Sequence, residues 1–202
     1  MEWGFLLAIM KMLGFSTTWI AWIRACISSA SFSILLNGSP FSIISPAKGL
    51  RQGDPLSPFL FILGFKVFSR LMFREERAGL IKGLQISRNT PSLHHLLFVD
   101  DLLIFGKAKL SEASCINTYL EKYCRWSSQA INTSKSFLRF SQNTIPSTIS
   151  SISSIFPFTS DPPKSLYLGH PILMGNSRRS AFLFIIDKVL SRIDGWRAKC
   201  LS

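Results

Sequence analysis

Two adjacent aspartates stand inside a strongly apolar stretch of this chain. Asp100 and Asp101 follow the residues LHHLLFV and precede LLIF. Neighbouring residues of a strand point to opposite faces, so two adjacent acids share one location only where the chain turns. A divalent cation such as Mg²⁺ stabilises two close carboxylates, because it prefers oxygen ligands. Two interpretations therefore stay open from these residues alone: a solvated hairpin turn or a metal-binding pair.

A second group of residues suited to chemistry lies in the segment GLRQGDPLSP at 49–58. Gly49 and Gly53 permit positive φ angles and a close approach of a ligand to the backbone. Arg51 and Gln52 offer hydrogen-bond donors to a phosphate, a sugar or a base edge. Taken alone, the segment also fits an ordinary loop that leads into a helix.

Helices and hairpins must position these groups. Periodicity and capping residues predict helices over 3–13, over 17–29 with Ser16 as N-cap, from Asp54-Pro55 or Ser57-Pro58 to about 78, from 111 to 126, and over 177–199. Turn residues between apolar runs predict hairpins over 31–45, around Asn37-Gly38, and over 94–106, with Asp100-Asp101 at the turn. Shorter strands are predicted at 83–87, 136–141 and 166–172. The mixture predicts an α+β fold.

Other polar residues receive no chemical role from their local pattern. Glu75, Glu76, Glu112 and Glu121 fit solvated positions on helices. His94 and His95 lead into the aspartates along a strand, so we expect one to face inward and the other outward.

The composition limits the class of protein. Of the 202 residues, 47% are hydrophobic, and 23 Lys and Arg stand against 11 acids, a net charge of +12. A basic globular chain favours a polyanionic partner such as nucleic acid. The four cysteines form no C-x-x-C pair, which favours reduced thiols and an intracellular location. No apolar run is long enough to cross a membrane, and Glu2 without a basic neighbour argues against a signal peptide.

Four of these stretches together resemble the reverse transcriptase domain of plant non-LTR (LINE-type) retrotransposons, and NGSPF at 37–41 is also typical of it. The segments are GLRQGDPLSPFLFIL at 49–63 for motif B, HLLFVDDLLIFGKA at 95–108 for motif C, INTSKS at 131–136 for motif D and YLGHPI at 167–172 for motif E. Motif C is usually written F/Y-A-D-D, and here Val99 replaces the alanine.

The resemblance implies an antiparallel, polymerase palm-like sheet with packed helices over 1–172 and the start of a thumb over 173–202. In such polymerases carboxylates hold two Mg²⁺ ions that activate the primer 3′-hydroxyl and hold the incoming triphosphate. Asp100 is then the primary metal ligand and Asp101 the weaker one. The implied partners are an RNA template, a DNA primer and deoxynucleoside triphosphates.

The resemblance also assigns roles around the metals. Arg51, Gln52 and Gly53 would line the site for template and nucleotide. Lys135 would lie near the pyrophosphate leaving group as a candidate proton donor; otherwise it is a solvated lysine at a strand edge.

One carboxylate of the family's site has no match. Aligning Trp3 with the tryptophan of the motif A pattern F/Y-D-x-V-x-W places that aspartate upstream of Met1, so we expect a palm without the motif A strand or the fingers. Glu2 sits at a terminus expected to fray and is a poor substitute, because metal ligands must be held within about 0.5 Å. The hairpin at 94–106 should then keep an unpaired edge and an exposed apolar face.

Three hypotheses follow: a reverse transcriptase-like domain inactive as this chain, a non-catalytic basic remnant that binds nucleic acid, or a pseudogene-like product without a function of its own.

Overall fold

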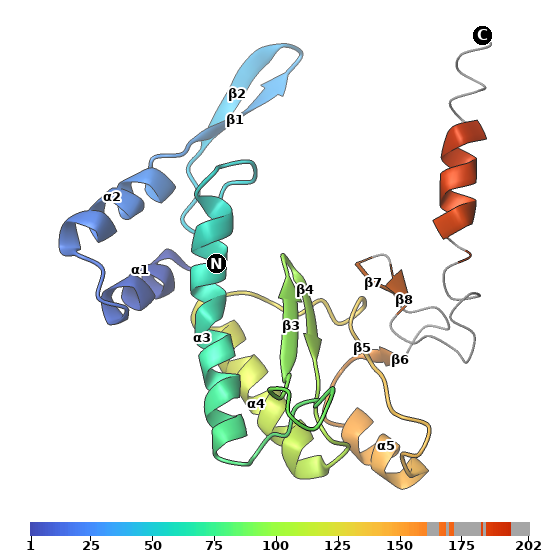
Figure 1. Ribbon diagram of the computed structural model, residues 1–202. Coiled ribbons are helices and arrows are strands. Elements are labelled where there is room, and N and C mark those ends of the chain that lie inside the picture. The colour runs from blue at the N-terminus through green and yellow to red at the C-terminus, as the bar shows by residue number, and fades with distance from the viewer. Residues whose placement is uncertain (161–165, 169, 172–182, 184, 195–202) are drawn as a thin grey trace. The chain divides into compact units, whose positions relative to one another are not determined.

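The computed structural model describes residues 1–160, 166–168, 170–171, 183 and 185–194 (Figure 1). The chain divides into two compact units, Met1–Thr159 and Ser160–Ser202. Helices and short strands alternate through the first unit, which confirms the predicted α+β class. The described strands form four separate two-stranded sheets rather than the single palm-like sheet that we expected.

The first two helices follow their sequence signals closely. Helix α1 (Trp3–Met12) and helix α2 (Thr17–Ser28) are separated at Gly14, whose φ is +86°. The Ser16 hydroxyl accepts a hydrogen bond of 3.2 Å from the Trp19 backbone N–H, so the predicted N-cap is confirmed. The two helices share a small apolar cluster with the beginning of α3, formed by Leu6, Met10, Ile23 and Leu60.

The first hairpin pairs β1 (Phe32–Leu36) with β2 (Ser39–Ile44). Asn37 and Gly38 have φ angles of +50° and +83°, as a type I′ turn requires. The register shifts between Ser33 and Ile34, which marks a bulge. Every residue of both strands is exposed, and the hairpin extends away from the helices (Figure 1).

Helix α3 (Ser57–Arg77) is the longest described helix and passes beside both α1 and α4. It begins between the two starts that the proline signals predicted, two residues after Pro55 and one residue before Pro58. Asp54 Oδ1 accepts from the Leu56 N–H at 2.8 Å in the loop before the helix, and Ser57 is the first helical residue rather than its cap. The helix ends at a backbone turn through Gly79, whose φ is +73°.

The second hairpin pairs β3 (His95–Phe98) with β4 (Asp101–Ile104), and helix α4 (Leu110–Ser127) follows it. The predicted strand at 83–87 is wrong in extent, since only Leu84 pairs, in an isolated bridge with Leu93. The segment's polar turn residues bond locally instead: Thr90 Oγ1 accepts from the Ser87 N–H at 3.0 Å.

The core lies between α3, α4 and the inner face of the β3–β4 hairpin. Its fully buried residues on α3 are Phe68 and Met72, which meet α4 at Leu120 and Tyr123. Leu97, Leu102 and Ile104 of the hairpin pack against this cluster. Burial of these large apolar groups is the main force that fixes the hairpin to the helices.

The remaining elements are short: β5 (Phe137–Leu138), α5 (Pro146–Ser153), β6 (Thr159–Ser160), β7 (Leu166–Tyr167) and β8 (His170–Pro171). The hairpin of β7 and β8 agrees with the short strand and turn predicted at 166–172. Residues 185–194 are helical, while the other positions of the predicted helix at 177–199, apart from 183, lie outside the described residues. The predicted boundary at 172 also lies outside them and stays a prediction. None of the described helices is long and apolar enough to cross a bilayer.

Candidate functional site

The two aspartates occupy different positions of the β3–β4 hairpin. Phe98 pairs with Asp101, so Val99 and Asp100 are the two central residues of the turn. We predicted both acids at the turn, but Asp101 is the first residue of β4. Of the two central residues only Val99 has a positive φ, +51°, a pattern that fits a type II′ hairpin turn.

Val99 is an unusual residue for this backbone conformation. Its branched Cβ disfavours positive φ, which costs on the order of 1–3 kcal/mol when a non-glycine residue adopts a sparsely populated region. The side chain is 65% exposed, so packing of its own does not offset that cost. The hairpin, anchored by its inner face, must therefore hold the turn in place. Such strain is concentrated at functional sites in proteins.

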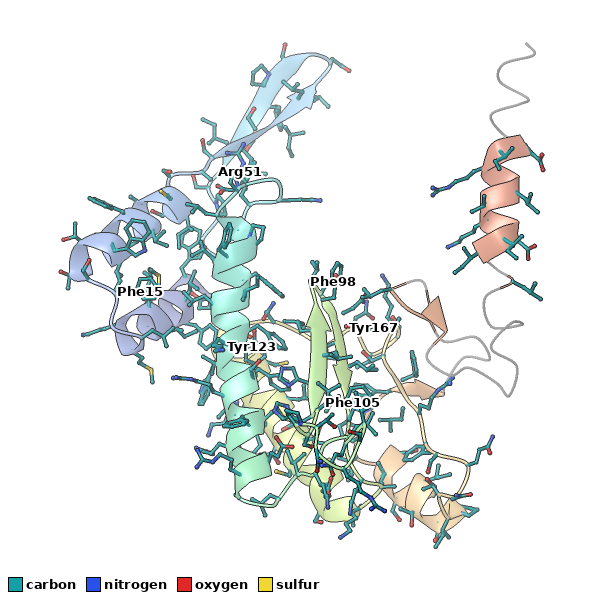
Figure 2. All side chains as sticks on the ribbon, viewed as in Figure 1. Phe15, Arg51, Phe98, Phe105, Tyr123 and Tyr167 are labelled. Carbon is teal, nitrogen blue, oxygen red and sulfur yellow. The ribbon has the colours of Figure 1, made fainter. Side chains whose placement is uncertain are left out.

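Both carboxylates are open to solvent. Asp101 lies opposite Phe98 and therefore on the same outer face of the hairpin, where Leu96 and Phe98 are exposed. The labels in Figure 2 mark Phe98 near the tip and Phe105 near the base. Asp100 is exposed at the tip itself. Within the described residues, neither carboxylate forms a hydrogen bond or an ion pair with another side chain. Their oxygens are free to bind a cation.

The carboxylate pair meets only part of the requirement for a two-metal site. One Mg²⁺ ion is commonly bound through one or two carboxylates together with substrate phosphates, and Asp100 and Asp101 supply that number of carboxylates. The described residues contain no group of three His, Cys, Asp or Glu able to hold a metal ion. The three-carboxylate arrangement implied by the resemblance is therefore absent from the part of the chain that the structure describes.

Glu2 is held in place, contrary to our expectation of a frayed terminus. Its backbone N–H donates to the Ser127 carbonyl at 2.8 Å, and the Met1 carbonyl accepts from the Gly49 N–H at 2.8 Å. These bonds fix Glu2 at the start of α1 and the end of α4. They do not join it to Asp100 or Asp101.

The loop at 49–54 is shaped by its glycines and by its neighbours. Gly49 and Gly53 have φ angles of +96° and +81°, and the Trp3 indole N–H donates to the Gly49 carbonyl at 2.6 Å. The guanidinium of Arg51 lies 5.9 Å from the centroid of the Phe32 ring, on the first hairpin. Gln52 and Gly53 are exposed.

The structure does not bring this loop into contact with the aspartates. The β3–β4 tip points toward the end of α3 where the loop lies (Figure 1). No hydrogen bond or ion pair among the described side chains joins Arg51 or Gln52 to Asp100 or Asp101. Joint binding of one ligand by the two groups therefore stays a prediction.

Lys135 lies in a turn at 133–135 rather than at a strand edge. Its backbone N–H donates to the Asn132 carbonyl at 3.1 Å, which fixes the turn, while its side chain is exposed. No ion pair within the described chain joins it to either aspartate.

A partly buried chain of polar side chains between the start of β3 and helix α3 was not predicted. His95 Nε2 and the Ser69 hydroxyl share a hydrogen bond of 2.9 Å, and the Nδ1 atoms of His95 and His94 share one of 2.6 Å. The His94 Nε2 lies 3.6 Å from a carboxylate oxygen of Glu76. The expectation of one inward and one outward histidine is wrong, because the rings stack at 4.6 Å and both are partly buried.

Burial, and then the nearby charge of His94, lowers the pKa of His95 to about 4. In the unfolded chain a histidine has a pKa near 6.5, so folding favours the neutral ring. We expect the contribution of the neutral His95 ring to the free energy of unfolding to be complete above pH 6.5. As the pH falls toward 4 this contribution is lost, and the free energy of unfolding should decrease by about 1–2 kcal/mol after allowance for solvent screening. Urea unfolding between pH 7 and 4, compared with His95→Asn, checks this. A parallel pH dependence in the two proteins would contradict it.

Two glutamates predicted as solvated are buried. Glu112 Oε2 accepts from the Lys107 N–H at 2.9 Å and from the Lys82 N–H at 3.2 Å. Glu75 accepts from the Arg74 guanidinium at 2.8 Å, and its pKa is lowered chiefly by a hydrogen bond with Tyr119. The sequence held a signal for Glu112, which is the third residue of α4 and so occupies a position from which glutamate commonly reaches back to free N–H groups.

Comparison with known proteins identifies a matching family and a relative. A family model described as reverse transcriptase (RNA-dependent DNA polymerase) matches residues 1–172. An uncharacterized mitochondrial protein of Arabidopsis thaliana is 49% identical over 67 residues, a match that covers 33% of this chain and 55% of the relative. The chain thus spans about half the length of that relative.

Proposed function

This chain belongs to the reverse transcriptase family, and from that premise we propose that residues 1–172 are the palm of a non-LTR retrotransposon reverse transcriptase, with residues 173–202 beginning its thumb. The observation that carries the proposal is the exposed Asp100-Asp101 pair at the end of a hairpin anchored to the core. The family binds nucleic acid and nucleoside triphosphates and uses Mg²⁺.

Under this proposal, each residue of the candidate site has one task. Asp100 would be the main ligand of Mg²⁺ and Asp101 the second, and Mg²⁺ bound there would supply charge stabilisation and activation of the 3′-hydroxyl. Arg51, Gln52 and Gly53 hold the template and the nucleotide through donors and exposed backbone. Lys135 gives a proton to the leaving pyrophosphate. The substrates are an RNA template, a DNA primer and deoxynucleoside triphosphates.

We further propose that this chain alone does not extend a primer. Two-metal transfer needs carboxylates held rigidly around both ions, and the described residues supply only the pair. The same observation favours a second function, in which the basic chain holds nucleic acid without chemistry. The net charge of +12 supports that alternative.

Primer extension tests both parts. The full chain is incubated with an RNA template, an annealed DNA primer, Mg²⁺ and the four nucleotides, beside Asp100→Ala. We expect extension by neither protein, and extension that Asp100→Ala abolishes would overturn the inactive assignment.

A second measurement follows Mn²⁺-induced NMR line broadening around the β3–β4 turn with a nucleotide present. Broadening lost in Asp100→Asn/Asp101→Asn supports the metal site, and its absence in the unchanged chain opposes it.

A further inference from the structure

One side of α3 carries both cations and large apolar side chains. At about 100° per residue, six positions fall within a sector of about 80° of the helix surface. These six residues, named here the α3 stripe, are Phe59, Ile62, Lys66, Arg70, Phe73 and Arg77, and all are exposed. The three apolar members are exposed to 70%, 61% and 53%, in chain order. The stripe therefore contributes little to the core.

The acids of α3 do not neutralise this surface. Glu75 is buried and bonded to Arg74, and Glu76 lies beside His94. Within the described residues, Lys66, Arg70 and Arg77 form no ion pair. The guanidinium of Arg77 lies 6.0 Å from the centroid of the Phe73 ring, so a cation and an aromatic face are presented together. Nitrogen-tipped side chains line this part of the helix in Figure 2.

The neighbouring surface of α4 continues the same chemistry. Arg74 Nη2 donates to the Tyr119 hydroxyl at 2.9 Å, which joins the two helices. The Lys122 ammonium lies 5.8 Å from the centroid of the Tyr119 ring and 4.9 Å from that of Trp126. Trp126 is exposed. Cations next to exposed aromatic rings thus occur on both helices.

We propose that the α3 stripe binds single-stranded nucleic acid, with phosphates on its three cations and bases stacked on Phe73 and Phe59. A positive track combined with aromatic platforms is the usual arrangement for single strands, whose bases are free to stack. A duplex hides its bases and would leave the exposed rings without a role. From Phe59 to Arg77 the stripe is about 27 Å long at 1.5 Å per residue, which suits a site of a few nucleotides.

The stripe is a separate surface from the Asp100-Asp101 turn. The side chains of α3 that meet the β3–β4 hairpin and the core include Phe65, Phe68, Ser69 and Met72, on other sectors of the helix. Binding at the stripe needs no metal ion and no primer terminus. The proposal therefore does not depend on polymerase activity.

Fluorescence anisotropy with a labelled 12-nucleotide oligo(dT) tests the charges, with the full chain titrated at several salt concentrations. We expect Lys66→Ala/Arg70→Ala/Arg77→Ala to weaken binding at least about tenfold and to make the log–log salt slope shallower by about 2, since each phosphate contact on a single strand contributes about 0.7. The matched control, Arg88→Ala/Lys107→Ala/Lys109→Ala, removes the same charge from exposed loops. Equal losses in both variants would overturn the site, because they would report net charge alone.

A second pair of variants tests the stacking. Phe73→Leu keeps an apolar side chain but removes the ring, and we expect several-fold weaker binding to the single strand with unchanged binding to a duplex of the same length. Phe15→Leu is the control, since Phe15 is exposed outside the stripe. Circular dichroism melting verifies that each variant folds. Tighter binding to the duplex than to the single strand, or no effect of Phe73→Leu, would overturn the assignment to single strands.

Discussion

Replacing Glu112 with alanine is expected to lower the free energy of unfolding by about 3 kcal/mol, because two N–H donors lose their acceptor at a buried position. One Glu112 oxygen accepts from Lys107 and Lys82, and the residue is only 6% exposed. The two donors belong to the segment after β4 and the segment after α3. One carboxylate therefore joins both segments to the first turn of α4, at the base of the hairpin that carries the aspartates.

Two further variants separate this role from the general effect of removing a charge. Glu112→Gln retains an acceptor oxygen and should lose roughly half as much stability as the alanine variant. Glu121→Ala removes an exposed acid of the same helix, which accepts from the Asn117 amide at 2.8 Å, and should cost no more than about 0.5 kcal/mol. Urea denaturation followed by circular dichroism measures all three. A stability of Glu112→Ala within 0.5 kcal/mol of the unchanged chain would contradict the role given to Glu112.

Truncation of Phe68 to alanine is the second large effect that we expect, a loss of about 3–5 kcal/mol. Phe68 is fully buried at the centre of the core. Its ring centroid lies 5.2 Å from that of Phe65, 5.6 Å from that of Tyr123 and 5.8 Å from that of His95. The substitution leaves a cavity between the two helices and the strand that leads to Asp100.

Thermal unfolding gives a direct measurement. For a chain of this length, each kcal/mol corresponds to about 2–4 °C, so the midpoint should fall by roughly 6–20 °C. Phe59→Ala is the matched control, since Phe59 is on the same helix but 70% exposed, and its midpoint should shift by a few degrees at most. Similar shifts in the two variants would show that Phe68 does not have the central place in the core described above.

Local sequence signals predicted the elements that depend on local physics. The Ser16 cap and the Asn37-Gly38 turn are decided by neighbouring residues, and both were predicted correctly. The strand expected at 83–87 depends on a partner strand, and only one pair forms there. Burial of Glu75 and Glu112 depends on donors supplied by distant segments, which helical periodicity does not reveal.

The candidate site was predictable in its residues but not in its geometry. Asp100 and Asp101 could be selected because two acids interrupt an apolar run. Their separation into a turn position and a strand position follows from the hairpin register, which one residue of slip would change. Whether Arg51 shares a ligand with them depends on how the loop before α3 is placed in space, and no local pattern encodes that distance.

The β1–β2 hairpin has a practical consequence for any solution of this protein. Residues 31–45 contain no charged side chain, although the whole chain carries +12. At low ionic strength the mutual repulsion of the copies keeps their uncharged strand edges apart over a Debye length of about 30 Å, which shrinks to about 8 Å at physiological salt. A high salt concentration that releases nucleic acid from the basic surface therefore also screens the repulsion that prevents edge-to-edge association of the hairpins. A buffer that purifies the protein from nucleic acid is for this reason unsuited to storing it.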